Sequence, residues 1–447
     1  MQAFINMPKP AQNEPATRFL AFKLALRLND EDLAMSSLAA VAKSAKNDPT
    51  YLYACVLAAG QSQTHRFSIV ALQALLDQRP NGIYLPALLR CTARLLLMEV
   101  DAGQNAEMVA QETLRVFEAA ARNTDEIRQL PNERWRSEIQ WWSKNAYNIA
   151  VKLCAQVSPE YVLRMLEVCT KFMDCYPNDP DLMLQDGLEK RILTCLFLSA
   201  TALIVLGRSS EEPPDYFTQC FSRAQQHIRS FKSSYAKLSN SLQDPKLQEQ
   251  AFTVLKFEIE CILRLQQWDK LGPALQACMK ATHVGRWDTL ADLLIIVHEE
   301  LDETTLDSHA EMLTQLLQRI INDTWKKERD IAKVARWLRF TFNLCLESSQ
   351  RDTASFSLKL LQQAGAMAES GSKGSKDPYP ESELQWLATM SFNHAVDLLE
   401  HDSDEAMKWI EGALQLAKWS DDDGSLHAML TRQKEKAIER AKDLQAA

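Results

Sequence analysis

Apolar residues recur every three or four positions along most of the chain, and short polar breaks separate the runs. Near the C-terminus, for example, Ala406, Ile410, Ala413 and Ala417 fall at i, i+4, i+7 and i+11, which is one face of a helix. The breaks come every ~35–50 residues, and most of them separate two amphipathic runs. Two of them are Asn29-Asp30 and Ser158-Pro159-Glu160, where we expect Asp30 and Ser158 to cap the helices that follow. Helix, break and helix repeated at this interval predict an array of helical pairs.

An aromatic–asparagine motif occurs in three of the predicted helices. A tryptophan precedes each asparagine by six or seven positions, and a small residue, Ala or Cys, follows it by two. The aromatic residue and a tryptophan six positions before the asparagine share one broad helix face, and the small residue lets a neighbouring helix approach closely. The copies are Tyr147-Asn148, Phe342-Asn343 and Phe392-Asn393. Their tryptophans are Trp142 and Trp337 at six positions, and Trp141 and Trp386 at seven.

These patterns predict an all-α fold, a tetratricopeptide-like (TPR-like) helical-repeat solenoid wound as an α-α superhelix. We expect the repeat array to span residues 16–420. Residues 1–15 are rich in Pro and Asn and are expected to be irregular, while residues 421–447 are expected to form a charged helix that caps the stack.

The most apolar run of the chain is Ile192–Gly207. It is shorter than the ~20 residues that a membrane-spanning helix needs, and it contains Thr and Ser. We interpret it as a buried helix inside the array and expect no contact with a membrane.

Composition supports this fold and narrows the function. Only 12 Gly and 16 Pro in 447 residues leave few tight turns for an all-β protein. The net charge of −9 differs from that of proteins that coat phosphates, which are basic at least locally. The most basic run, Thr324–Arg339, is diluted by Glu328 and Asp330. A nucleic-acid face is one interpretation of this run, and a solvated helix face is the other.

The sequence carries no recognisable catalytic or metal-binding motif. Its ten Cys are scattered without a C-x-x-C pair, and most lie in apolar helical context, so we expect buried free thiols. His298-Glu299-Glu300 resembles part of a metalloprotease helix, but Asp302 stands where the second His is needed. Glycine motifs that bind phosphate or expose a nucleophile are missing from the sequence. We therefore predict that the protein is not an enzyme and uses no cofactor or metal.

The motif asparagines are the candidate partner-binding residues. Asn148, Asn343 and Asn393 lie about 100° around the helix from the aromatic residue before them. In that position they can line a concave groove and hydrogen-bond an extended peptide. The alternative is that each satisfies a neighbouring backbone or side-chain group within the stack.

Three further segments accompany the motif helices, namely Asn47–Ala59, Gly82–Leu97 and Tyr379–Leu399. Together these stretches resemble the fungal meiotic tetratricopeptide-like scaffold family, of the Zip-four or sporulation-specific Spo-twenty-two type. The similarity runs from about Arg18 to about Trp419. Members of this family are usually considerably longer at the N-terminus, so the chain is expected to correspond to their C-terminal portion.

The resemblance implies a non-enzymatic scaffold in the nucleus, on meiotic chromosomes, that promotes crossover formation and synaptonemal-complex assembly. It implies partners among crossover and synapsis proteins, including a nuclease-like heterodimer that binds DNA junctions, and contact with DNA only through them. The net negative charge of the chain fits a scaffold that binds proteins and leaves DNA binding to its partners. The alternative function is a general TPR adaptor in the cytosol that binds a chaperone or another complex. A chaperone clamp usually needs several matched basic residues, and the motif helices carry few.

Overall fold

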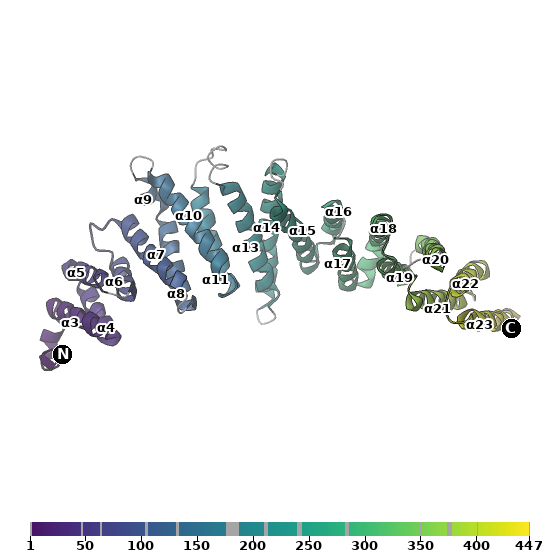
Figure 1. Cartoon of the computed structure of the whole chain (residues 1–447), viewed down its shortest axis with the longest axis horizontal. Helices are drawn as coiled ribbons and strands as arrows, with labels where there is room; N and C mark the ends of the chain where they lie inside the picture. The colour runs from purple at the N-terminus through teal and green to yellow at the C-terminus, as the bar shows by residue number, and fades with distance from the viewer. Residues whose placement is uncertain are drawn as a thin grey trace. The chain divides into compact units, whose positions relative to one another are not determined.

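The protein is all-α throughout the part of the chain that the structure describes. This structure is a computed structural model. It describes residues 2–45, 48–62, 65–102, 106–130, 134–175, 187–209, 213–238, 244–281, 286–347, 351–372, 378–399 and 401–446. Helices follow one another through these ranges as pairs joined by short breaks (Figure 1). The predicted all-α, TPR-like helical-repeat solenoid is confirmed.

The chain divides into two compact units, residues 1–243 and 244–447. We call the first helix of each pair the A helix and the second the B helix. The A helices of the first unit are α3 (Pro15–Leu28), α5 (Thr50–Gly60), α7 (Leu85–Ala102), α10 (Arg134–Leu153) and α13 (Leu188–Gly207). Its B helices are α4 (Glu31–Ser44), α6 (His65–Gln78), α8 (Ala106–Arg122), α11 (Pro159–Asp174) and α14 (Pro214–Leu238). The short α9 (Thr124–Arg128) lies between α8 and α10 in the chain.

The second unit repeats this arrangement. Its A helices are α15 (Pro245–Arg264), α17 (Trp287–Glu300), α19 (Ile331–Glu347) and α21 (Glu381–Leu398). Its B helices are α16 (Leu271–Ala281), α18 (Glu303–Lys327), α20 (Arg351–Ser372) and α22 (Ser403–Ala417), with a 3₁₀ turn η1 (Trp268–Lys270) before α16. The last helix, α23 (Ser425–Ala446), packs on α21 and α22, so the predicted C-terminal helix is present.

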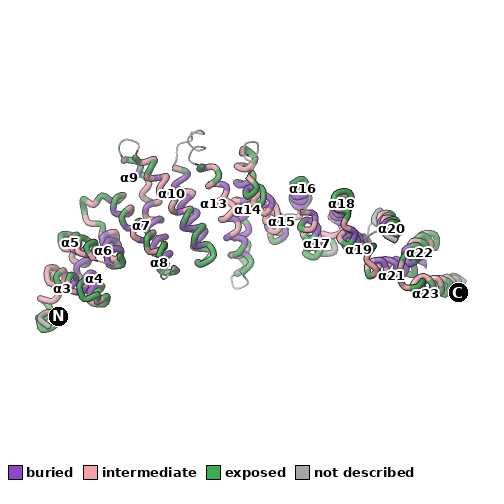
Figure 2. Tube along the Cα trace, in the orientation of Figure 1, coloured by how far each residue is buried: buried purple, intermediate pink, exposed green. Residues whose placement is uncertain are grey.

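Helices pack against their pair partners, and many of them also pack against an adjacent pair. In the first unit α11 contacts α10, α8 and α13, and in the second α22 contacts α21, α20 and α23. Consecutive A helices also touch, as α19 and α21 do. Buried positions accordingly follow the sides of the helices that face their neighbours (Figure 2). The core of each unit is therefore a seam that runs along the stack.

The starts of several helices are fixed by capping side chains. Asp30, Ser158 and Asp302 each accept a hydrogen bond from the backbone N–H three positions later, at 3.0, 3.3 and 2.8 Å. Pro159 occupies the first position of α11, where its missing N–H costs nothing. Asn29 ends α3 in the left-handed conformation, with φ +52°. The breaks predicted at residues 29–30 and 158–160 are confirmed.

The prediction of an irregular segment at residues 1–15 is wrong for most of its length. Two short helices occur there, α1 (Gln2–Ile5) and α2 (Lys9–Gln12), and α3 begins at Pro15. The prolines mark helix starts in this segment because a proline is tolerated in the first helical turn. The Gln12 amide also donates hydrogen bonds to the backbone carbonyls of Ile5 and Met7, at 3.2 and 2.9 Å, which joins the two short helices.

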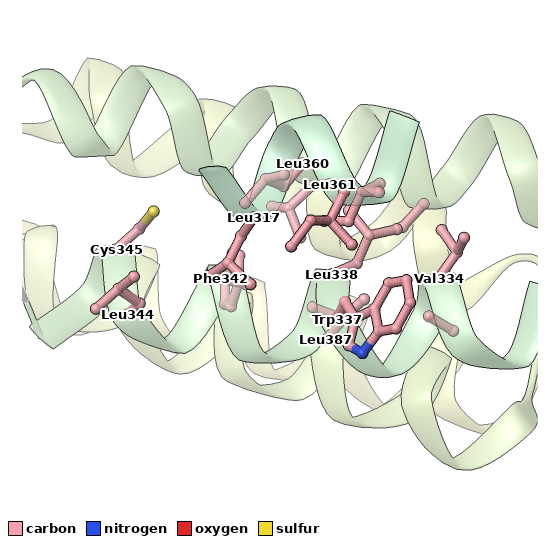
Figure 3. Close-up of a cluster of buried hydrophobic side chains, with 14 of the residues drawn as sticks. Leu317, Val334, Trp337, Leu338, Phe342, Leu344, Cys345, Leu360, Leu361 and Leu387 are labelled. Carbon is pink, nitrogen blue, oxygen red and sulfur yellow. The ribbon is translucent and has the colours of Figure 1, made fainter. Parts of the chain in front are cut away.

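The second motif copy forms part of the core of the second unit. Trp337 and Phe342 on α19 are fully buried (Figure 3). Leu387, which stands six positions before the third motif asparagine, lies against Trp337 in the same cluster (Figure 3). The small residues two positions after the asparagines are buried as well, as a close helix approach requires: Ala150, Cys345 and Ala395.

The most apolar helix is α13. It begins at Leu188, four residues before the apolar run Ile192–Gly207 that the sequence shows. The expectation that this segment is too short to cross a membrane is wrong, because its 20-residue helix is long and apolar enough to do so by length and composition. In the structure it packs against α11 and α14. Gly207 brings it so close to Phe221 that a Cβ atom there would lie 2.7 Å from the ring. These contacts are those of the core helix that the sequence predicts.

Candidate interaction face of the A helices

The motif asparagines lie on the side of their A helices that faces away from the core. On α10 the core side carries Trp142, Ala146 and Ala150, all buried. The opposite side is exposed or half-buried, and we call it the outward face. On α10 the outward face carries Trp141, Lys144, Asn148 and Val151, at i, i+3, i+7 and i+10.

The same spacing recurs on two neighbouring A helices of the second unit. On α19 the corresponding residues are Arg336, Arg339, Asn343 and Leu346. On α21 they are Trp386, Thr389, Asn393 and Val396. The structure thus places the three predicted asparagines at equivalent positions, one in the first unit and two in the second.

The three asparagines differ in their hydrogen bonds. Asn148 and Asn393 are exposed, and the side chain of neither makes a hydrogen bond to another residue of the described ranges. Asn343 is half-buried, and its amide donates to Glu347 Oε1 at 2.6 Å within α19. The same carboxylate lies 2.9 Å from His298 Nε2 on α17. Local satisfaction, the alternative left open by the sequence, therefore holds for Asn343, whereas the other two amides face solvent.

An arginine from the preceding A helix covers the outward tryptophan in two of the copies. Arg90 of α7 lies over the Trp141 ring at 3.5 Å and pairs with Glu138 at 2.6 Å. Arg339 of α19 lies over the Trp386 ring at 4.4 Å and pairs with Glu383 at 3.5 Å. In both copies the glutamate stands three positions before the tryptophan, so one turn of helix presents both partners of the guanidinium.

At the contact between α17 and α19, the cations and the acids are on the opposite helices from those in these two copies. Here the later helix supplies the cations: Lys333 lies 2.7 Å from Asp288, and Arg336 lies 3.4 Å from Asp292. Each step between these consecutive A helices is therefore bridged by ion pairs, but the direction of the pairing is not fixed by the motif.

These ion pairs bear on the basic run at residues 324–339. Three of its cations, Lys333, Arg336 and Arg339, are matched by acids on neighbouring helices. They therefore form no uncompensated row for phosphates, which favours the solvated-face interpretation over a nucleic-acid face.

The histidine of the metalloprotease-like triplet has a structural setting. The His298 ring meets the Phe340 ring edge-on at 5.4 Å and reaches Glu347 through Nε2. In the ranges that the structure describes, no three His, Cys, Asp or Glu side chains are grouped closely enough to hold a metal ion.

Sequence reasoning missed two features of the outward face. The stacked arginines Arg90 and Arg339 were not singled out, although a glutamate three residues before a tryptophan is a usable local signal. The cysteines were expected to be buried, and Cys55, Cys195 and Cys345 are, but Cys91 and Cys154 are exposed. Cys91 stands on the outward side of α7, so an apolar helical context alone did not distinguish its two sides.

The B helices of the first unit show a regular ladder of ion pairs. In each step an arginine reaches back to an acid on the preceding B helix. The pairs are Arg66–Glu31 (3.4 Å), Arg115–Asp77 (3.6 Å), Arg164–Glu118 (2.7 Å) and Arg223–Glu167 (2.6 Å). Exposed pairs of this kind add little stability, so the ladder serves mainly as a marker of the repeat.

Comparison with known proteins gives only distant likenesses. No protein-family model matches the chain, and no curated protein matches it. Among solved structures, a circular tandem repeat protein with novel repeat topology is 13% identical over 94% of this chain and 97% of its own, with a TM-score of 0.33. A chain of the full-length AP-3 complex (13% identity, 95% and 81% coverage) has a TM-score of 0.23. A chain of Naa15/Naa10 bound to HypK-THB (13%, 100% and 76%) has a TM-score of 0.16. Similarity this weak bears on neither partners nor activity.

Proposed function

We propose that the protein is a non-enzymatic scaffold that binds other proteins along the outward faces of its A helices. The observation that carries this proposal is the recurrence of one surface pattern at equivalent positions of α10 and α21. Each presents a half-buried tryptophan with an arginine stacked on it, an exposed asparagine amide with no hydrogen-bond partner among the described residues, and an exposed valine. Partner segments need such aromatic, amide and apolar groups to dock, and the fold holds them on rigid helices.

Within that class, we propose a role in meiosis, in crossover formation and synaptonemal-complex assembly on chromosomes in the nucleus. The resemblance carried by the motif helices supports this finer function. The charge distribution is compatible with it: residues 244–447 carry 24 Lys and Arg against 34 Asp and Glu, so the second unit suits protein partners better than DNA. Crossover and synapsis proteins, among them the junction-binding heterodimer, are the proposed partners.

The experiment is a pull-down of the tagged full chain from meiotic and vegetative cultures, with partners identified by mass spectrometry. Recovery of crossover and synapsis proteins from meiotic cells alone is the expected result. Chaperones or one constitutive complex from both cultures would replace the meiotic role with the general adaptor. Recovery of no specific partner from either culture would remove the scaffold proposal itself.

A pair of variants ties the result to the proposed face. Asn148→Ala/Asn393→Ala removes the two solvent-facing amides, and we expect it to reduce partner recovery. The matched control is Gln111→Ala/Gln315→Ala, which removes one exposed amide from a B helix of each unit. Equal recovery with both double variants would show that partners bind elsewhere on the chain.

A further inference from the structure

The face formed by α7 and α10 in the first unit combines exposed apolar groups with exposed cations. On α7, Cys91, Arg94 and Met98 are exposed at i, i+3 and i+7. On α10, Lys144 and Val151 are exposed on the same face as Trp141 and Asn148. Met98 is 50% exposed and Val151 is 41% exposed, which is more than a helix buried in a repeat stack requires.

Two ion pairs fix the register of these helices. Arg90 pairs with Glu138 towards their N-terminal ends, and Asp101 pairs with Lys152 at 2.7 Å towards their C-terminal ends. The helices therefore run side by side in the same direction. Counting inward from both pairs places Arg94 close to the level of Lys144, with Met98 level with the turn that carries Asn148.

Neither Arg94 nor Lys144 is matched by an acid in the described ranges, in contrast to three cations on α19. Lys333, Arg336 and Arg339 on α19 all have carboxylate partners. Burial lowers the pKa of Arg90, Glu138 raises it, and the charge of Arg94 lowers it, so the two guanidinium groups lie close enough to repel each other. A second cation beside a partly buried guanidinium costs free energy in the absence of a counter-charge.

We propose that the outward face of α7 and α10 binds a segment of a partner protein in which acidic and apolar residues are combined. Carboxylates of that segment pair with Arg94 and Lys144, and its apolar side chains cover Met98 and Val151. The Asn148 amide then hydrogen-bonds the partner's backbone. This inference rests on the proposed scaffold function and names the chemistry of one of its partners.

A nucleic acid fits this face less well than an acidic peptide. Two cations are too few to follow a phosphate backbone, and the carboxylates of Glu138 and Asp101 flank them. The exposed methionine and valine give a duplex nothing to contact, whereas apolar side chains of a peptide gain by covering them.

Selection from a random peptide library displayed on phage, with the full chain as target, tests the proposal. Enriched peptides are synthesised, and their affinity is measured by fluorescence anisotropy for the wild type and two charge-reversal variants. Arg94→Glu/Lys144→Glu reverses the two cations of this face. Lys171→Glu/Lys237→Glu is the control, because it makes the same change in charge at exposed lysines of the B helices α11 and α14.

The expected peptides are rich in Asp, Glu and apolar residues. Their affinity falls about tenfold or more with Arg94→Glu/Lys144→Glu, stays unchanged with the control, and weakens as salt is added. Peptides without acidic enrichment, equal effects of the two variants, or no enrichment at all would overturn the proposal. If charge reversal prevents folding, Arg94→Gln/Lys144→Gln replaces it, with a smaller loss of affinity expected.

Two further measurements separate the remaining explanations. Light scattering of the wild type and of Arg94→Glu/Lys144→Glu reports whether the face binds a second copy of the chain, and a dimer lost in the variant would overturn the proposal. The same variant is also used in the pull-down. If the variant recovers the same partners as the wild type, the scaffold function stands and the proposal of an acidic partner segment is rejected. If the wild type recovers no partner, the scaffold function itself is rejected.

Discussion

The two units use the same motif helix but present different surfaces. In α10 of the first unit, Lys144 is exposed, has no acidic partner among the described residues, and lies next to exposed apolar side chains. In α19 of the second unit, the equivalent Arg339 stacks on Trp386 and pairs with Glu383. The net charges of the two units differ as well. Residues 1–243 carry 26 Lys and Arg against 25 Asp and Glu, whereas residues 244–447 carry 24 Lys and Arg against 34 Asp and Glu.

This difference shows that the motif specifies packing and leaves the outward face free to vary. The buried side is nearly the same in all copies: a large apolar residue six positions before the asparagine and a small one two after it. The outward side keeps the asparagine and an aliphatic residue but changes its charge. A repeat fold allows this separation, because side chains on one side of a helix hold the stack while the other side is available to partners.

The largest effect expected from the comparison is on the buried side. Trp337→Ala should lower the free energy of unfolding by about 3–5 kcal/mol, because a fully buried indole is replaced by a cavity. Trp142→Ala should do the same in the first unit. Trp386→Ala should cost clearly less, since Trp386 is half-buried on the outward face. Urea unfolding followed by circular dichroism measures all three.

Trp337→Phe provides the control for that prediction. The Trp337 Nε1–H is buried and has no hydrogen-bond partner among the described residues, so phenylalanine keeps most of the apolar volume and removes an unsatisfied donor. It should cost much less than Trp337→Ala. An unfolding midpoint that does not change in Trp337→Ala would contradict the assignment of the motif to the core.

The next effect concerns the arginines that cover the outward tryptophans. Arg90→Ala should cost about 1–2 kcal/mol, through loss of the stacking on Trp141 and of the pair with Glu138. Arg339→Ala should cost less, because its side chain is 42% exposed against 25% for Arg90, and its distances are longer. Unfolding midpoints at low and high salt measure both. Equal losses would show that the two contacts are energetically the same despite their geometry.

A smaller effect should appear as the pH is lowered. Burial lowers the pKa of His227 on α14, and the charge of Arg223 lowers it further. Burial also lowers the pKa of His394 on α21, but Asp397 raises it. A folded-state pKa below the unfolded value means that the unfolded chain binds more protons, so stability is lost as the pH falls below about 6.5.

The two histidines should therefore differ between the units. His227→Gln should flatten the dependence of stability on pH more than His394→Gln, because both influences on His227 act in the same direction. Thermal melts between about pH 7.5 and about pH 5 provide the measurement. A stability that rises on acidification through either histidine would contradict the direction assigned to its pKa.

Much of the fold could be predicted from the sequence because local signals determine it. The 3.6-residue periodicity predicts the helices. Asp30 and Ser158 mark two helix starts, because each side chain accepts a hydrogen bond from the backbone N–H three residues later. The N-terminal segment was misjudged because a proline both breaks one helix and opens the next. Only the surroundings of Pro8 and Pro15 decide between these roles.

The candidate site could be predicted only in part. Spacing within one helix placed the three asparagines on an equivalent face, which the structure confirms as a placement; their binding of partners stays a prediction. The arginine partners of the tryptophans were not predicted. The glutamate three residues before each tryptophan marks the place locally, but Arg90 and Arg339 come from another helix, far away in the sequence. The unpaired state of Arg94 likewise depends on which residues the neighbouring helices bring near it, and no local pattern encodes that.

The smallest expected effect on stability falls on the asparagines, and it separates their two possible roles. Asn148→Ala and Asn393→Ala should change the free energy of unfolding by no more than about 0.5 kcal/mol, since both amides face solvent. Asn343→Ala should cost somewhat more, about 0.5–1.5 kcal/mol, because it loses the hydrogen bond to Glu347. Partner binding should follow the opposite order, with the solvent-facing amides mattering more. Unfolding midpoints combined with the affinities of selected peptides test both orders, and a large loss of stability in Asn148→Ala would make that residue part of the stack rather than of a binding face.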